Sequence, residues 1–369
     1  MKKLGFGLMR LPVTCPGNQK SIDQETLNKM ADRFIEQGFT YFDTAYPYHE
    51  GMSEGAFRKA VADRYPREQF TIADKMPVWL VKGSADYQRI FAEQLSRCGV
   101  GYFDYYMLHA LDAERYPETV KFGGFEFIKK LKADGKAKHI GFSFHDKADV
   151  LDKILSEHPE VDFVQLQINY IDWDDKGIQS RKCHETALKH GTPVVVMEPV
   201  KGGCLASLPE EADKLFKAHN ANAGSASWAI RFAASLDKTI VVLSGMSSFE
   251  QLADNAAFMR DFKPLNDEER VIIKKAAEII SANIAIPCTG CMYCVEGCPQ
   301  KIPIPRYFSL YNNQKQYGLI PSIIGSYAFA SDGVGKAKDC IACKQCEEHC
   351  PQHIAIADNL KEVAKVFER

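Results

Sequence analysis

The chain has 369 residues, which is enough for one barrel-sized domain and a smaller second domain. Hydrophobic residues make up 46% of it and charged residues 25%, as is usual for a soluble globular protein. The formal net charge of -2 gives no support to a nucleic acid or a membrane surface as partner. No apolar run reaches the roughly 18 residues that span a bilayer, and no signal segment is recognisable at the start. We therefore expect a cytoplasmic protein with no nucleic-acid or membrane partner.

Short apolar segments alternate with longer amphipathic segments over residues 1–265. Eight strand-like segments alternating with helical patterns predict a parallel (β/α)8 TIM barrel, which is an α/β fold. An open doubly wound sheet is the alternative, but Gly5-Phe6-Gly7 lacks the third glycine and the helix of a dinucleotide-binding fingerprint. The strands are expected at Leu4–Leu8, Phe39–Ala45, Phe70–Lys75, Tyr105–His109, His139–Phe144, Phe163–Gln167, Val194–Glu198 and Ile240–Gly245.

A helix start at Pro264–Glu269 marks the boundary of a second domain. A proline, a polar capping residue and acids in the first turn begin a helix that we expect to end near Ala282. We therefore place a linker helix and a small, mainly helical domain in residues 266–369. Further helices are expected at Tyr307–Tyr317 and Leu360–Phe367.

Eight of the twelve cysteines lie between Cys288 and Cys350. Clustered cysteines in an intracellular chain favour metal binding over disulfides. A run of four cysteines, separated by two, two and three residues and followed by proline, occurs twice. Paired zinc sites are the alternative, but zinc sites usually take separate pairs of cysteines. The two runs are Cys288, Cys291, Cys294, Cys298 and Cys340, Cys343, Cys346, Cys350.

The spacing of the runs resembles the bacterial ferredoxin motif, in which three thiolates hold one [4Fe-4S] cluster and the fourth cysteine ligates the other cluster. The resemblance implies two [4Fe-4S] clusters in a ferredoxin-like domain. The first would be held by Cys288, Cys291, Cys294 and Cys350, and the second by Cys340, Cys343, Cys346 and Cys298.

Polar side chains stand near the ends of three successive expected strands. Asp43, Lys75 and His109 come at the strand ends, and Tyr48 follows in the loop after the first of them. A parallel barrel presents its catalytic groups at the carboxyl ends of its strands. Each residue alone is more often structural, but an acid, an amine, an imidazole and a phenol together form a proton-transfer set.

These positions resemble the catalytic tetrad of the aldo-keto reductases. The segments Gly5–Gly7, Asp43–Tyr48 and Leu108–His109 match that family's motifs in order, and the resemblance covers about residues 4–260. It implies that Tyr48 is the general acid and that the ammonium of Lys75 lowers the pKa of Tyr48. It also implies that Asp43 pairs with the same lysine and that His109 orients the substrate oxygen.

The resemblance further implies a nicotinamide cofactor. Ser143 and Gln165 match the residues that hold its carboxamide, and Asn255 matches an adenine contact. Met197 stands where the family has the aromatic residue that stacks on the nicotinamide, and Phe144 replaces an expected asparagine.

The residues that would grip the 2′-phosphate of NADPH differ from the family pattern. Gly245 and Gln251 replace basic residues there, so NADH is at least as good a match as NADPH, unless Lys201 supplies a substitute charge. The implied cofactor-binding residues are Gly7, Met9, Asp43, Ser143, Gln165, Met197, Pro199, Gly202, Gly245, Gln251 and Asn255.

Two functions from different classes remain open at this point. The first is an NAD(P)-dependent oxidoreductase that reduces a small aldehyde or ketone, with the clusters serving a redox partner protein. The second is an electron-transfer or redox-sensing protein in which the barrel is a binding scaffold. Purely structural clusters are a third reading. Specificity is expected to lie in loops such as Pro77–Ser84 and Leu111–Gly124, where Trp79, Tyr116 and Phe122 are candidate pocket residues.

Overall fold

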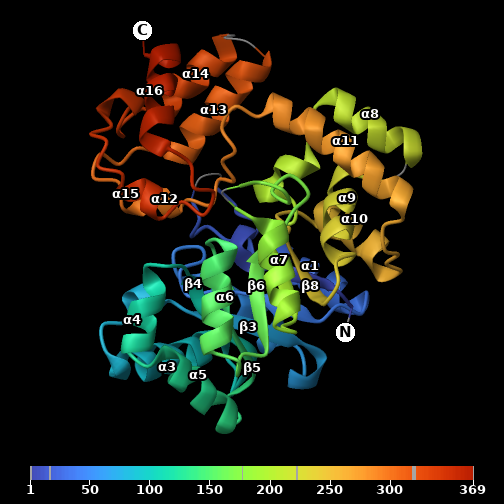
Figure 1. The fold of residues 1–369 in the computed structure, drawn as a ribbon, viewed down its shortest axis with the longest axis vertical. Coiled ribbons are helices and arrows are strands. Elements are labelled where there is room, and N and C mark those ends of the chain that lie inside the picture. Colours follow the sequence, from blue (N-terminus) through green and yellow to red (C-terminus); the bar gives the residue numbers. More distant parts are fainter. Residues whose placement is uncertain (1, 16–17, 177, 222, 318–320, 369) are drawn as a thin grey trace. The chain divides into compact units, whose positions relative to one another are not determined.

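The chain forms two compact units (Figure 1). The computed structural model describes residues 2–15, 18–176, 178–221, 223–317 and 321–368. The first unit consists of Met1–Asp174, Gln179–Pro199 and Ala226–Asp267. The second unit consists of Glu268–Arg369 together with two earlier segments, Asp175–Ile178 and Val200–Ser225. The sequence alone had given no sign that the segment after the seventh strand groups with the cysteine region.

The first unit is a closed barrel of eight parallel strands in sequential order, which confirms the predicted fold class. The strands are β1 (Leu4–Gly7), β2 (Tyr41–Asp43), β3 (Thr71–Met76), β4 (Phe103–Leu111), β5 (Ala137–Phe144), β6 (Phe163–Gln167), β7 (Val194–Met197) and β8 (Thr239–Gly245).

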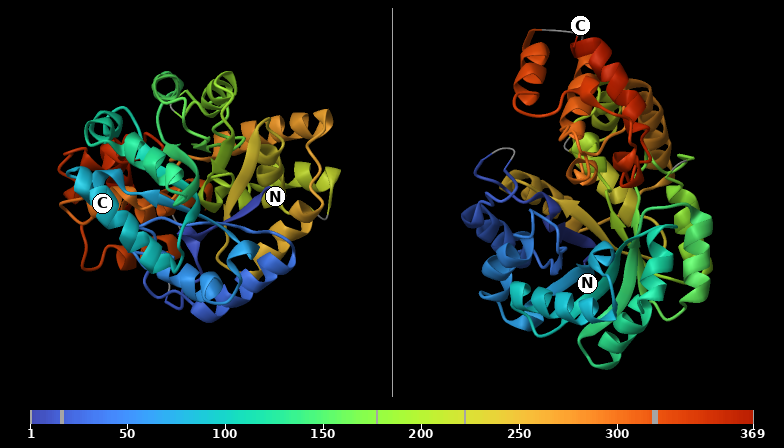
Figure 2. Two further views of the ribbon diagram at one scale, coloured as in Figure 1. Left: turned by 90° about the horizontal axis from the view of Figure 1, so that it is seen from below. Right: turned by 90° about the vertical axis from the view of Figure 1, so that its left-hand side faces the viewer.

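The helices of this unit lie around the strands (Figure 2). Each carries an apolar face that packs on the outside of the barrel. They are α1 (Gln24–Glu36), α2 (Ser53–Phe57), α3 (Ser84–Cys98), α4 (Arg115–Lys121), α5 (Gly124–Ala133), α6 (Ala148–Glu157), α7 (Ser180–Lys189), α9 (Ser225–Ala234) and α10 (Phe249–Arg260).

Alternation along the strands sorts the side chains into an inner and an outer set. One buried cluster fills the barrel interior and contains Tyr41, Ala73, Met107, Phe163, Val195, Val241 and Leu243. Intervening residues such as Phe42 and Ile72 are buried and face the helices instead. The residue two positions after a member of the inner cluster therefore points inward again, one layer closer to the carboxyl ends of the strands.

The second unit is mainly helical, as the sequence predicts. Its core includes Tyr307, Phe308, Tyr327, Leu360 and Val363. Helix α13 packs against both α14 and α16 (Figure 1). Among the described residues, no helix is both long and apolar enough to cross a membrane. The helices are α8 (Glu210–His219), α11 (Asp267–Asn283), α12 (Tyr293–Glu296), α13 (Ile304–Tyr317), α14 (Pro321–Ala330), α15 (Gln345–Glu348) and α16 (Ile356–Phe367).

Candidate active site

The four residues of the expected tetrad converge at the carboxyl ends of β2, β3 and β4. Lys75 Nζ donates a hydrogen bond to the Asp43 carboxylate and another, of 2.7 Å, to the carbonyl oxygen of Thr44. The same nitrogen lies 4.8 Å from the centre of the Tyr48 ring. The rings of Tyr48 and His109 have centroids 6.1 Å apart and meet edge to face. The structure thus brings an acid, an amine, a phenol and an imidazole into one group.

The electrostatics of Tyr48 differ from the expectation. Burial, followed by the negative charges of Asp43 and Glu198, raises the pKa of the phenol well above its ordinary value. The net shift is thus opposite to the expected lowering by Lys75, whose ammonium is paired with Asp43 and faces the ring rather than bonding to the hydroxyl. Tyr48 therefore keeps its proton at neutral pH.

His109 is held neutral at the same site. Burial, then the positive charge of Lys75, lowers the pKa of its imidazole well below the ordinary value. Its Nδ1 atom is buried and has no hydrogen-bond partner among the described residues. Trp79, from the loop after β3, covers the ring with its centroid 5.0 Å away. Of the three pocket candidates in the loops, Trp79 thus contacts the site, whereas Tyr116 packs against Phe125.

Neighbouring positions on β5 and β6 form a polar cradle suited to a carboxamide. Ser143 pairs in register with Gln165, and both side chains are buried. Ser143 Oγ accepts a 2.7 Å hydrogen bond from the backbone N–H of Ala110, which leaves the hydroxyl proton available to donate. Gln165 Oε1 is buried without a partner in the described part of the chain. A hydroxyl donor beside an unsatisfied amide oxygen fits the acceptor and donor of a nicotinamide carboxamide.

The expected phosphate and adenine positions surround the end of β8. Gln251 Oε1 accepts a 2.8 Å hydrogen bond from the N–H of Ser247, and Asn255 donates one of 2.9 Å to Ser244 Oγ. The side chain of Arg10 lies over Gly245, where a Cβ would stand 3.3 Å from Arg10 Cβ. Arg10 is a cation that the sequence analysis missed, because it follows β1 and not β8.

The remaining expected cofactor residues are divided between the two units. Gly7 ends β1, Met9 lies in the short turn Leu8–Arg10, and Met197 ends β7. Pro199 is buried and also belongs to the first unit. Gly202 belongs to the second unit, where it packs against Thr289. The structure therefore does not group Gly202 with the others.

A buried acidic pair lies on the helix side of β3, directly beside the lysine position. The carboxylates of Glu54 and Asp74 and the sulfur of Cys98 are all buried and within 4.8 Å of one another. Asp74 Oδ1 accepts a 2.8 Å hydrogen bond from the N–H of Lys75, and Arg97 donates one of 3.0 Å to Glu54. Burial, followed by the charge of Glu54, raises the pKa of Asp74 well above its ordinary value. Asp74 therefore keeps its proton to a higher pH than an ordinary aspartate does.

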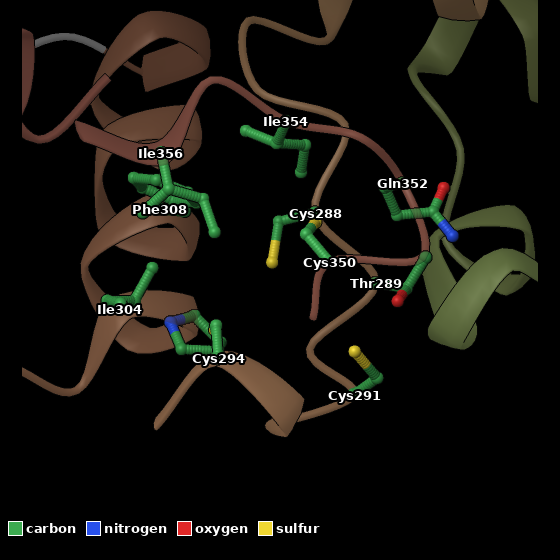
Figure 3. A pocket seen from close by; sticks show the side chains of 11 residues that line it. Cys288, Thr289, Cys291, Cys294, Ile304, Phe308, Cys350, Gln352, Ile354 and Ile356 are labelled. Carbon is green, nitrogen blue, oxygen red and sulfur yellow. The ribbon is translucent and has the colours of Figure 1, made fainter. Parts of the chain in front are cut away.

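The second unit gathers the cysteines as the ferredoxin resemblance implies. Cys288, Cys291, Cys294 and Cys350 line one cavity, although Cys350 belongs to the other run (Figure 3). Burial raises the pKa of the Cys288 thiol to about 11, and the thiol of Cys350 adds to this effect. A bound metal would reverse that effect, since iron binds the thiolate form.

The second set shows the same exchange of ligands between the runs. Burial, then the charge of Cys340, raises the pKa of Cys346 to about 11, and Cys298 from the first run adds to this. Cys343, the other member of the set, is exposed. The donor types and their arrangement therefore fit two clusters with crossed ligands.

Equivalent residues of the two runs have the same unusual backbone. Gly290 and Ala342 have positive φ angles, and so do Met292 and Lys344, each just before a short helix. Non-glycine residues rarely adopt this conformation, and where they do it often serves a function. It curls the chain so that backbone N–H groups reach sulfur, as Gly290 N does with Cys288 Sγ at 3.4 Å.

The crossed ligands can be tested by counting iron in serine variants. Cys291→Ser and Cys350→Ser should each lose about half of the iron, and so should the double variant, because both residues serve one cluster. Cys291→Ser combined with Cys343→Ser should lose nearly all of it. Iron per chain after anaerobic purification is the measurement. Nearly complete loss in the Cys291/Cys350 double variant would contradict crossed ligation.

The raised pKa of Asp74 predicts a pH dependence of stability. Because the pKa of Asp74 is raised on folding, the native state binds more protons, and the free energy of unfolding should fall as pH rises toward that pKa. Asp74→Asn removes the titration and should show a smaller loss than the parent protein as pH rises above the ordinary pKa range of an aspartate. Urea unfolding followed by tryptophan fluorescence reports on the first unit, which holds Trp79, Trp173 and Trp228. Glu25→Gln, at an exposed pair, is the control and should leave the dependence unchanged.

Comparison with known proteins identifies two regions. The Aldo/keto reductase family matches residues 3–278, and the 4Fe-4S dicluster domain matches residues 287–355. The NADH-specific methylglyoxal reductase of Escherichia coli is 28% identical over 189 residues, which cover 46% of this chain and 54% of that protein. The chain thus spans about half the length of this relative.

Solved structures share the fold of the barrel. An aldo-keto reductase from Bacillus halodurans in its holo form superposes with a TM-score of 0.59 at 23% identity, covering 74% of this chain and 91% of the other. An aldo-keto reductase from Klebsiella pneumoniae in complex with NADPH superposes with a TM-score of 0.58 at 21% identity. This match covers 74% of this chain and 90% of the other. The Aldo/keto reductase family model matches well over half of this chain. The chain therefore belongs to the aldo/keto reductase family, and it carries a 4Fe-4S dicluster domain after the barrel.

Proposed function

We propose that the protein reduces a small aldehyde or ketone by hydride transfer from a nicotinamide dinucleotide. The observation that carries the proposal is the convergence of Tyr48, His109 and the Lys75–Asp43 pair at one end of the barrel. The polar cradle of Ser143 and Gln165 supports it, because it offers one donor and one acceptor to a carboxamide.

Carbonyl reduction needs a hydride on carbon and a proton on oxygen. The nicotinamide supplies the hydride when it is bound. Tyr48 keeps its proton at neutral pH and donates it to the oxygen as negative charge develops there. The Lys75 ammonium, against the ring of Tyr48, stabilises the resulting phenolate. Neutral His109 donates a hydrogen bond that orients the oxygen without competing as an acid.

The charge distribution near β8 favours NADH as the dinucleotide. Gly245 and Gln251 offer no charge to a 2′-phosphate, and Arg10, the cation beside Gly245, is already paired with Glu198 at 3.9 Å. The Escherichia coli relative is described as NADH-specific, whereas the Klebsiella pneumoniae structure contains NADPH. We assign the adenine contact to Asn255 from its position on α10.

The eight cysteines of the dicluster domain suit a role in electron transfer. A nicotinamide gives up two electrons together, whereas each [4Fe-4S] cluster carries one. Two clusters in one chain match that number of electrons. We therefore propose that the clusters connect the barrel reaction to a redox partner protein.

One observation favours the second function, electron transfer or redox sensing with the barrel as a scaffold. Met197 is half-buried at the end of β7, where the aldo-keto reductases place an aromatic ring against the nicotinamide. A flexible thioether gives less stacking area than an aromatic ring. The scaffold function does not require an intact proton-transfer group, which this chain has.

The role of Tyr48 can be tested with a pair of variants in the same loop. Tyr48→Phe removes the proton donor, so NADH-dependent reduction of a small aldehyde such as methylglyoxal should fall by about 10²–10⁴-fold. Tyr46→Phe is the matched control, because the Tyr46 phenol bonds to Glu93 at 3.2 Å; it should retain near-normal rates. Steady-state rates and NADH binding are measured for both. Undiminished reduction by Tyr48→Phe would remove Tyr48 from the mechanism.

An anaerobic titration separates the two functions and tests the cofactor. Iron-replete protein is titrated with NADH and then with NADPH while the visible absorbance of the clusters is followed. We expect NADH to bleach the absorbance and a test aldehyde to restore it. Normal aldehyde turnover without bleaching would refute a connection between the barrel and the clusters, and bleaching without any aldehyde turnover would favour the scaffold function.

A further inference from the structure

The turn Lys201–Ala206 in the second unit packs tightly against the first cysteine run. Gly202 has a φ of +65°, and a Cβ there would lie only 2.1 Å from the carbonyl oxygen of Thr289. Cys204 Sγ lies 3.9 Å from the carbonyl oxygen of Cys288. A glycine is therefore required at 202 by the approach of residues 288–289, and the turn is fixed beside the cluster ligands.

Lys201 is the buried cation of this turn. Its side chain is 2% exposed, and its Nζ donates a 2.9 Å hydrogen bond to Gln352 Oε1. Gln352 lies two residues after Cys350 and lines the cavity formed by the first cysteine set. Figure 3 shows Gln352 and Thr289 on one side of this cavity, next to the ribbon of the turn. The ammonium is therefore held by a residue that follows the second run, and its charge acts on the Cys288 thiol of the first set.

The second cysteine set has a different charge environment. Lys361 lies near Cys340, but its side chain is 62% exposed and pairs with Asp358 at 2.8 Å. Solvent screens such a charge, whereas a buried charge acts through a lower dielectric. The carboxylate of Glu347 adds to the raised pKa of a thiol in each set, Cys346 and Cys350. It therefore does not distinguish the two sets.

We propose that Lys201 sets the reduction potential of the cluster held by the first cysteine set. The buried ammonium stabilises the added negative charge of the reduced cluster, which raises its potential above that of the second cluster. The cluster next to Lys201 is then the better electron acceptor of the two. Lys201 places a positive charge near the cluster and does not itself bind iron. The inference depends on the two ligand sets but not on carbonyl reduction.

Lys201→Met removes the charge with little change in length. The potentials are measured in the full-length, iron-loaded protein by dithionite titration with EPR detection, and iron is counted in each sample. We expect one of the two one-electron waves to shift to a lower potential. The equilibrium constant for reduction of that cluster should fall at least tenfold, which corresponds to a shift of about 59 mV. The other wave should stay in place. Lys201→Arg keeps the charge. Its equilibrium constant for reduction of the same cluster should lie within about threefold of that of the parent protein.

Two further variants make the test decisive. Lys361→Met removes an exposed lysine near the second set and should move neither wave by as much as tenfold. Lys201→Gln also removes the charge but keeps a polar end that can bond to Gln352, and it should shift the same wave as Lys201→Met, in the same direction. This variant decides the matter if Lys201→Met fails to retain its iron. Unchanged waves, or equal shifts of both waves, in the charge-removal variants would overturn the proposal.

Discussion

Alternation of side chains along the strands of a closed parallel barrel is the constraint on which the site depends. Tyr41, Ala73 and Met107 fill the interior, and two positions further along the same strands stand Asp43, Lys75 and His109. The same step leads from Phe163 to Gln165 on β6. The catalytic layer is thus stacked directly on the apolar layer, and its position is set by the packing beneath it.

A second constraint follows from placing a lysine in that layer. A buried ammonium requires a partner, and Asp43 with the Thr44 carbonyl meets this need for Lys75. The pairing has opposite consequences for the two neighbouring rings. The ammonium still contributes to the lowered pKa of His109, whereas the Asp43 carboxylate adds to the raised pKa of Tyr48. Both groups are therefore neutral at the site before a substrate binds.

Much of this arrangement could be predicted from the sequence, because periodicity and strand-end residues are local signals. The barrel, the strand-end tetrad and the two cysteine runs have such signals. Arg10 could not be found in this way, since its place beside Gly245 arises only when β1 and β8 close the barrel. The Glu54–Asp74 pair is likewise created by a helix packing on a strand, and acids at those positions look like surface residues in sequence. The pKa of Tyr48 depends on burial, which spacing does not reveal.

In the segment after β7, the type of a residue does not by itself reveal its role. A glycine at Gly202 suits a phosphate, but it equally suits the close approach of Thr289, and the structure has the latter contact. The chain leaves β7 at Met197, belongs to the second unit by Val200 and returns at Ala226, before β8. The second unit is therefore joined to the first through the β7–β8 connection and the segment Asp175–Ile178 as well as after Asp267. A domain joined by one terminal linker can unfold without strain on its neighbour. Here unfolding of the second unit would also release the segment that connects two strands of the barrel.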